Sequence, residues 1–315
     1  METATRVLTH GRTELGKVIV GQEELINQCL LTILCGGHAL LEGVPGIAKT
    51  LVIKCLARLL ELEFRRVQCT SDLMPADIIG SNVLNLPTST FSLHRGPLFT
   101  DLLLADEINR MPPRTQAALL EAMEERQITI DGIPHPLTQF FTVFATQNPV
   151  EFEGTYPLPE AQLDRFLLKI KVNYPQAGEE ISILENVHNG FDSRRLDTVP
   201  IAVLNTSDLK EAREEVRRTK VEPALFRYIV ELVRRTRDWP ALGLGASPRA
   251  AISLMMVAKA VAALEERDYL IPDDVKTAAL PVLRHRVMLK PEAELEGLSS
   301  DQVLTEIIGT VEVPK

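Results

Sequence analysis

The sequence lacks the features that mark membrane proteins, disulfide frameworks and metal sites built from protein ligands. No apolar run approaches the ~18 residues that a membrane-spanning helix needs, and the N-terminus has no apolar signal core. The four cysteines show no C-x-x-C spacing, and the six histidines form no H-x-x-x-H pair. We therefore expect a cytoplasmic protein whose cysteines are buried free thiols.

Positive charge and aromatic side chains are also scarce. The 315 residues carry 34 Lys and Arg against 43 Asp and Glu, a formal net charge of −9, and aromatics make up 5 %. Nucleic-acid binding relies on an excess of cations and on stacking, so this composition argues against a nucleic-acid partner. The 45 % of apolar residues are enough for a packed core, and the length suggests two domains of roughly 150 residues each.

The first half of the chain alternates short apolar strands with helices. Such alternation predicts a mostly parallel sheet with helices on both faces. Two predicted hairpins interrupt it, one over 81–96 with its turn at 87–89, and one over 126–141 with an Asp131-Gly132 turn. The expected strands lie at 38–43, 63–69, 101–107, 139–149 and 166–172, and the expected helices at 3–18, 22–35, 49–62 and 114–126.

The strand signal stops after about residue 173, and the remaining apolar pattern has helical spacing. We therefore divide the chain into an α/β domain over 1–174 and an α-helical lid domain over 175–315. Ser247 is the expected N-cap of one lid helix, with Pro248 in its first turn. The helices expected in this domain lie at 175–187, 222–238, 247–268 and 272–286.

The stretch "GVPGIAKT" (43–50) resembles the phosphate-binding pattern G-x-x-x-x-G-K-[ST], with Ala48 in place of the second glycine. We interpret Ala48 as already turning into the following helix, where a methyl group is tolerated. Lys49 would then reach the β- and γ-phosphates, and the Thr50 hydroxyl would hold Mg²⁺. The predicted nucleotide-binding loop comprises Gly43, Val44, Pro45, Gly46, Ile47, Ala48, Lys49 and Thr50.

Two acidic residues follow a predicted strand about 60 residues later, in "LLLADE". Asp106 would act on Mg²⁺, largely through its waters, and Glu107 would be the general base that polarises the attacking water. Two acids after a strand are common as a loop start or helix cap. Their occurrence behind a glycine loop makes a nucleotide-hydrolysing site the better interpretation.

Three further polar residues complete the candidate site. Asn148 ends a later apolar strand, where its amide could orient the water, although Asn-Pro is also an ordinary turn. Arg165 in "QLDRF" could be an arginine finger offered to a neighbour's site. Arg249 in "GASPRAA" could swing onto the γ-phosphate from the second domain, although either arginine could instead form a surface ion pair.

The motifs together resemble an AAA+ ATPase, and more closely the MoxR family. The resemblance rests on "GVPGIAKT", "LLADEINR" (103–110), "LLEAMEERQITIDG" (119–132), "ATQNPVEFEGTYPLPEAQLDRF" (145–166) and "GASPRA" (245–250), in the family's order. It covers nearly the whole chain, and alanine before the lysine is common in this family. The resemblance implies an AAA+ P-loop core with a five-stranded parallel sheet, followed by an all-α lid domain.

The resemblance also implies roles and partners. It makes 81–96 the helix-2 insert, 126–141 the pre-sensor-1 insert, Asn148 sensor 1, Arg165 the finger and Arg249 sensor 2. It places Val20 and Gly21 near the adenine. It implies a hexameric ring with ATP and Mg²⁺ at subunit boundaries, a chaperone-like action on protein clients, and a partner with a von Willebrand factor A domain.

Two other functions fit parts of the sequence. "MEERQITI" also resembles a stretch of replicative helicases of the same clade, which would make the protein a nucleic-acid translocase, but "IDGIPHPL" in the second hairpin carries no Lys or Arg. The other alternative is a non-enzymatic scaffold, in which ATP binding orders the ring but ATP is not hydrolysed. The presence of both Glu107 and Asn148 argues against it.

Overall fold

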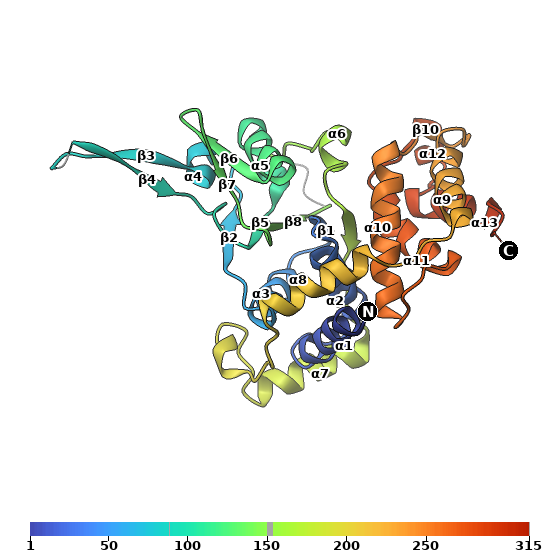
Figure 1. The fold of residues 1–315 in the computed structure, drawn as a ribbon, viewed down its shortest axis with the longest axis horizontal. Helices are drawn as coiled ribbons and strands as arrows, with labels where there is room; N and C mark the ends of the chain where they lie inside the picture. Colours follow the sequence, from blue (N-terminus) through green and yellow to red (C-terminus); the bar gives the residue numbers. More distant parts are fainter. Residues whose placement is uncertain (88, 150–153, 315) are drawn as a thin grey trace.

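The computed structural model describes residues 1–87, 89–149 and 154–314, and its centre is a five-stranded sheet in the order β2-β5-β8-β1-β9 (Figure 1). All four neighbouring pairs are parallel, which confirms the predicted sheet. The strands therefore all end at one edge, the carboxyl edge, and all begin at the opposite amino edge. The strands are β1 (Ala39–Glu42), β2 (Phe64–Gln68), β5 (Leu102–Asp106), β8 (Thr142–Gln147) and β9 (Leu168–Lys171).

The central strands are buried on both faces because their apolar side chains alternate between two separate cores. Leu41 and Phe144 belong to the core formed with α1 (Glu2–Gly16), α2 (Glu23–Cys35) and α3 (Lys49–Leu59). Leu40 and Val143 belong to the core formed with α5 (Pro113–Glu125). This double burial explains the continuous apolar runs in the sequence. Two short helices, α4 (Pro75–Ile79) and α6 (Glu160–Leu163), and a 3-10 turn, η1 (Ile108–Arg110), lie in the connections.

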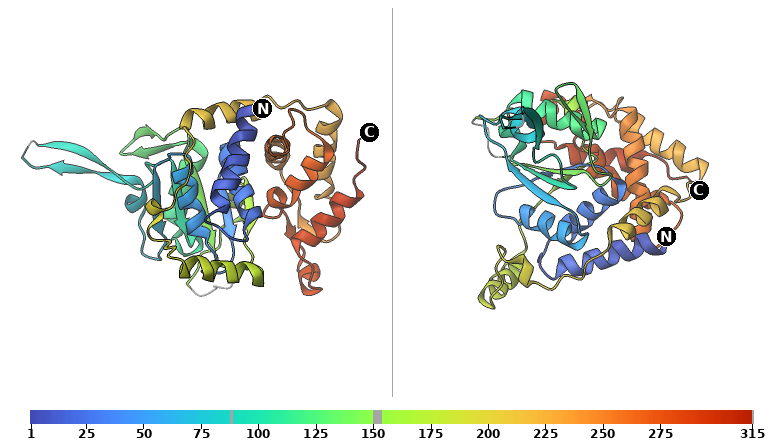
Figure 2. Two further views of the ribbon diagram at one scale, coloured as in Figure 1. Left: turned by 90° about the horizontal axis from the view of Figure 1, so that it is seen from below. Right: turned by 60° about the vertical axis from the view of Figure 1, so that its left-hand side comes forward.

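Two antiparallel hairpins extend from the α/β domain. The longer one, β3 (Gly80–Asn85) with β4 (Thr90–Arg95), projects away from the rest of the molecule (Figures 1 and 2), and its predicted turn includes residue 88, outside the described residues. The shorter one joins β6 (Gln127–Ile130) and β7 (Ile133–Pro136). Its turn residues Asp131 (φ 50°) and Gly132 (φ 79°) both have the positive φ that a tight two-residue turn requires. The side-chain amide of Asn82 donates a 2.7 Å hydrogen bond to Asp131, which links the two hairpins.

The last third of the chain is mostly helical, with one exception to the prediction. A short antiparallel pair, β10 (Leu242–Leu244) and β11 (Met288–Leu289), shows that strands do not stop at residue 173. Pro248 begins α10 as predicted, but the Ser247 hydroxyl bonds to Asp164, 3.1 Å away, and caps no backbone group of the helix. The helices are α9 (Pro223–Arg235), α10 (Pro248–Leu264), α11 (Pro272–Leu283), α12 (Pro291–Leu295) and α13 (Ser300–Thr310).

The segment between the sheet and these helices returns to the α/β domain. After α7 (Ala177–His188) and the 3-10 turn η2 (Leu196–Thr198), helix α8 (Thr206–Arg217) packs against α1 and α2. The Glu215 carboxylate accepts a 2.8 Å hydrogen bond from the Ala4 backbone N–H. The domain boundary at 174–175 therefore stays a prediction, because α8 follows it in sequence and covers the first domain.

The cysteines are free thiols, as expected, and three of them are buried, whereas Cys35 is partly exposed. Burial raises the pKa of Cys55 to about 11 and that of Cys69 to about 12, so neither is a nucleophile at neutral pH. None of the helices over the described ranges is long and apolar enough to span a bilayer.

Candidate functional site

The glycine loop joins the carboxyl end of β1 to the start of α3, which begins at Lys49. A Cβ on Gly43 would lie 2.6 Å from the Val172 carbonyl oxygen, so no larger residue fits there. Gly46 has φ +85°, and an added Cβ would meet no atom within 4 Å. Glycine is therefore needed there for the backbone conformation and not for lack of space. The Lys49 amine donates to the Gly43 carbonyl across the loop. The first turn of α3 follows this loop directly, and the N-terminus of a helix presents backbone N–H groups that can bind phosphate.

Ala48 corrects the sequence interpretation. It precedes the helix as its N-cap residue and has φ 64° and ψ 11°, the left-handed conformation that glycine adopts most readily. The methyl group is therefore not in a helical turn, where it would be favourable. An alanine in this conformation costs about 1 kcal/mol relative to right-handed backbone. Backbone strain of this kind is common where a loop must direct its N–H groups at a ligand.

Substitutions at Ala48 test this geometry. We expect Ala48→Gly to keep ATP affinity and to change the free energy of unfolding by no more than about 1 kcal/mol, because relief of strain offsets the entropy of glycine. Ala48→Val should weaken ATP binding at least tenfold, since β-branched residues are poorly tolerated at positive φ. Thermal unfolding and titration with a fluorescent ATP analogue would measure both. Equal ATP affinity in the two variants would contradict the left-handed assignment.

The two predicted acids lie at the carboxyl edge, at the end of β5. The Thr146 hydroxyl on the adjacent strand β8 donates a 2.6 Å hydrogen bond to Asp106 and accepts a 2.8 Å bond from the Glu107 backbone N–H. Glu107 has φ 60°, a left-handed conformation that turns its side chain out of the strand direction. Thr146 thus holds the Asp106 carboxylate and the backbone of Glu107.

Two residues of β2 and one of η1 contact these acids and were not found from the sequence. The Arg66 guanidinium forms an ion pair with Asp106, with Nη2 2.6 Å from Oδ2. The Gln68 amide donates a 3.0 Å hydrogen bond to Glu107 Oε2, and Arg110 Nε lies 3.2 Å from the same oxygen. Arg66 and Gln68 point to one face of β2, which pairs with β5, so they could be recognised only once that pairing was known.

The structure brings Asn148 to the same edge. It follows β8, which lies between β1 and β5, and it is buried, with 7 % of its surface exposed. The Gly43 N–H donates a 3.2 Å hydrogen bond to the Gln147 carbonyl, so a backbone hydrogen bond joins the loop to the segment that carries Asn148.

Val20 and Gly21 lie between α1 and α2, and a Cβ on Gly21 would lie 2.3 Å from the Glu179 carboxyl.

The oxygen donors at this edge fit Mg²⁺. Thr50 supplies a hydroxyl in the first turn of α3, and Asp106 supplies a carboxylate at the end of β5. Mg²⁺ prefers few protein oxygens together with waters and phosphate oxygens. Within the described ranges, no three His, Cys, Asp or Glu side chains lie close enough together to hold a metal alone. Thr50 and Asp106 therefore suit a metal that arrives with a nucleotide.

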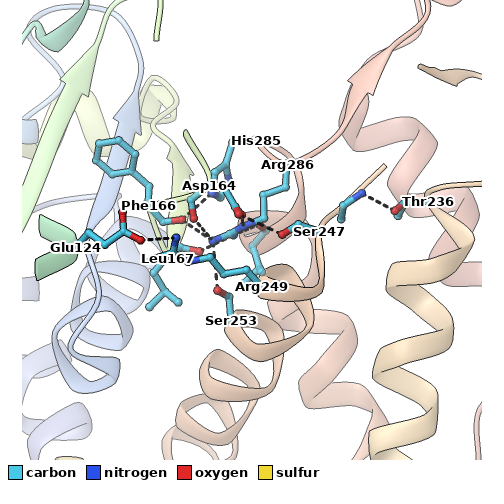
Figure 3. A network of polar contacts seen from close by, with 12 residues as sticks. Glu124, Asp164, Phe166, Leu167, Thr236, Ser247, Arg249, Ser253, His285 and Arg286 are labelled. Carbon is cyan, nitrogen blue, oxygen red and sulfur yellow. Dashed lines mark hydrogen bonds and ion pairs between the residues drawn. The ribbon is translucent and has the colours of Figure 1, made fainter. Parts of the chain in front are cut away.

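The two predicted arginines lie together, at the opposite edge. Arg165 Nε is 2.9 Å from Glu124 Oε2. Arg249 Nη1 is 3.3 Å from Glu124 Oε1, and both of these residues are drawn in Figure 3. They line one cavity of about 170 Å³ with His38, which precedes β1. Arg165 comes just before β9, whose first residue, Leu168, pairs with Ala39. The four residues of β1 separate this amino edge from the glycine loop by about 13 Å.

This placement changes the interpretation of Arg249. The sequence suggested that it could reach the γ-phosphate from the second domain, but in this arrangement it lies beside Arg165 and away from its own loop. Both side chains are partly exposed, at 29 % for Arg165 and 48 % for Arg249. One carboxylate faces two guanidinium groups, so the cluster keeps a net positive charge that can attract an anion from outside the chain.

The comparisons with known proteins agree with this architecture. Residues 38–168 match the model of the ATPase family associated with various cellular activities (AAA), and residues 234–307 match an AAA lid domain. The chain is 44 % identical to the uncharacterized protein YeaC of Bacillus subtilis, over 95 % of this chain and 92 % of that protein. It is 42 % identical to chaperone MoxR1 of Mycobacterium tuberculosis, over 96 % of this chain and 81 % of that protein.

A solved structure extends the similarity to the fold. The crystal structure of a protein from Cytophaga hutchinsonii, proposed to be an ATPase, superposes with a TM-score of 0.90 and 43 % identity, covering 100 % of this chain and 98 % of that one.

Proposed function

The chain belongs to the MoxR family of AAA ATPases and hydrolyses ATP, and we propose that it does so in a ring of identical subunits to remodel protein clients. The observation that carries this proposal is the separation of the two halves of the site on one subunit. The loop and the acids lie at the carboxyl edge of the sheet, and Arg165 and Arg249 lie at the amino edge. A complete site then needs two copies of the chain, with the arginines of one facing the loop of the next.

Within that site each residue has a proposed task. Lys49 and the N–H groups of the loop bind the phosphates, and Thr50 and Asp106 hold Mg²⁺, which neutralises developing charge on the phosphate oxygens when bound. Glu107 accepts a proton from the attacking water, and Asn148 orients that water. Arg165 and Arg249 of the neighbouring subunit stabilise the charge on the transferred phosphoryl group.

A head-to-tail contact of this kind closes into a ring when the rotation between subunits is suitable. We propose a hexamer from the family resemblance, and a partner carrying a von Willebrand factor A domain on the same ground. The free thiols suit a reducing compartment, which supports the cytoplasm as the proposed location.

The long hairpin supports a protein client over nucleic acid. Its sequence from Gly80 to His94 contains no Lys, Arg, Asp or Glu. Leu86 and Phe91 expose 77 % and 72 % of their surface, and Val83 exposes 51 %. Nucleic-acid binding would need cations along such a projection. Exposed apolar side chains on a projecting element are instead suited to contact an unfolded polypeptide.

An ATPase assay distinguishes the two kinds of client. We expect a reduced, carboxymethylated polypeptide to raise the hydrolysis rate, and we expect Leu86→Ser with Phe91→Ser to weaken that response. Thr90→Ser in the same hairpin is the matched control. A rate that instead rises with DNA and loses this stimulation as salt increases from about 50 to 200 mM would favour the nucleic-acid translocase.

A further inference from the structure

Arg286 lies at the junction between the lid helices and the segment that carries Arg165 (Figure 3). It follows the end of α11, and 2 % of its side chain is exposed. A buried guanidinium needs an ionic partner and a nearly full set of hydrogen bonds, because an unpaired buried charge is costly. The groups that Arg286 contacts therefore indicate which segments of the chain it stabilises.

Most of these contacts go to three residues that flank Arg165 in sequence. Nε donates to Asp164 Oδ1 at 2.7 Å. Nη2 donates to the Phe166 carbonyl at 2.7 Å and to the Asp164 carbonyl at 3.2 Å, and Nη1 donates to the Leu167 carbonyl at 3.1 Å. The backbone on both sides of Arg165 is thus bonded to one side chain.

The remaining contacts of Arg286 belong to the lid. Nη2 lies 3.3 Å from the Ser253 hydroxyl of α10, and Nη1 donates to the Val282 carbonyl of α11. The Ser247 hydroxyl at the start of α10 donates to the other Asp164 oxygen. Arg249 lies two residues further along, so both candidate trans-acting arginines are fixed to one buried cluster.

The chemistry of this cluster is specific to arginine. A guanidinium has five N–H donors in a rigid plane, which can bind several carbonyls and a carboxylate at once, whereas lysine has one flexible ammonium group. Burial lowers the pKa of Arg286 and the Asp164 hydrogen bond opposes that shift. Arginine remains protonated at neutral pH, so the contacts persist.

A neighbouring arginine provides the comparison that separates positioning from general stability. Arg284 is also largely buried, with 8 % of its side chain exposed, and it also joins the lid to the sheet domain. Its partners are Asp301 on α13, at 3.1 Å, and the Lys169 carbonyl on β9, at 3.3 Å. Within the part of the chain that the structure describes, Arg284 forms no hydrogen bond or ion pair with residues 164–167, so it differs from Arg286 in what it holds.

We propose that Arg286 is a positioning residue for the arginine finger: it holds residues 164–167 so that Arg165, together with Arg249, faces the neighbouring subunit's ATP. This inference rests on the proposed function, in which those arginines act across the boundary. It also makes the finger segment move with α10 and α11, so the lid of one subunit sets the activity of the next.

Mixing variant subunits tests the proposal. Arg286→Gln should bind an ATP analogue normally but hydrolyse ATP at least tenfold more slowly, since its own loop and acids are intact. Mixed with Glu107→Gln subunits, which supply an intact finger, it should regain about a quarter of the wild-type rate, the share of boundaries that pair an intact loop with an intact finger. Mixed with Arg165→Ala subunits it should regain nothing.

Arg284→Gln is the matched control, and it should keep the wild-type rate per folded subunit and shift only the unfolding temperature. If Arg286→Gln fails to fold, Asp164→Asn replaces it, because the Asp164 side chain is 22 % exposed. This variant should show the same pattern of rescue with a smaller loss of the hydrolysis rate. A fully active Arg286→Gln ring, or one that assembles but is not rescued by Glu107→Gln, would overturn the proposal. If Arg165→Ala is itself not rescued by Glu107→Gln, the proposed function fails instead.

Discussion

Replacing Glu107 by Gln is expected to leave ATP binding intact and to slow hydrolysis by about 10²- to 10⁴-fold, the range that general-base catalysis contributes. Gln keeps the size of the side chain and can still contact Arg110 and Gln68, so the geometry at the end of β5 should be kept. It cannot accept the proton of the attacking water. Phosphate release under single-turnover conditions and binding of a fluorescent ATP analogue would measure the two effects separately.

The matched control for this variant is Glu125→Gln, which removes an exposed carboxylate from the end of α5. It should hydrolyse ATP at the wild-type rate. Undiminished phosphate release by Glu107→Gln would remove the residue from the role of base. It would also leave the left-handed backbone at this position, φ 60°, without a functional reason.

Arg165→Ala should lower the hydrolysis rate by about 10³-fold or more, because an arginine finger supplies that much stabilisation of the transition state. ATP affinity of the isolated subunit should be unchanged, since the sheet separates Arg165 from its own loop. Removing the side chain also leaves Glu124 with Arg249 alone, an exposed pair worth at most about 1 kcal/mol, so the fold should tolerate it. Steady-state ATPase rates and thermal unfolding would check both expectations.

Arg194→Ala, which removes a side chain that is 91 % exposed, is the control and should be fully active. A second comparison is Glu124→Gln, which weakens the ion pairs that hold both arginines in the free subunit. Full activity of Arg165→Ala would assign the residue to a surface ion pair only.

The order of strands and helices in the first domain could be predicted because local patterns determine it. The central strands β1, β5 and β8 are short apolar runs buried on both faces, and the loop and the acids come at the ends of such strands. The Asp131-Gly132 turn could also be predicted, because both residue types tolerate positive φ. Helix α13 could also have been found, since Ser299 and Gln302 form a capping box.

The conformation of Ala48 and the positions of the arginines could not be read from the sequence. Motif spacing gives no dihedral angle, so a residue before a helix and one inside it look alike. The partners of Asp106 and Glu107 come from β2 and β8, which are distant in sequence and meet only in the sheet. Likewise Arg165 and Arg249 share Glu124 because the lid folds against the amino edge, which depends on tertiary packing.

The central claim is that each ATP site is built from two subunits, and mixing two inactive variants tests it most directly. Arg165→Ala subunits have an intact loop and base, and Glu107→Gln subunits have an intact finger. In an equal mixture about a quarter of the boundaries would combine the two intact halves. The ATPase rate should therefore rise well above that of either variant alone, toward a quarter of the wild-type rate. A mixture no faster than the average of the two parent variants, in rings shown to exchange subunits, would contradict the claim.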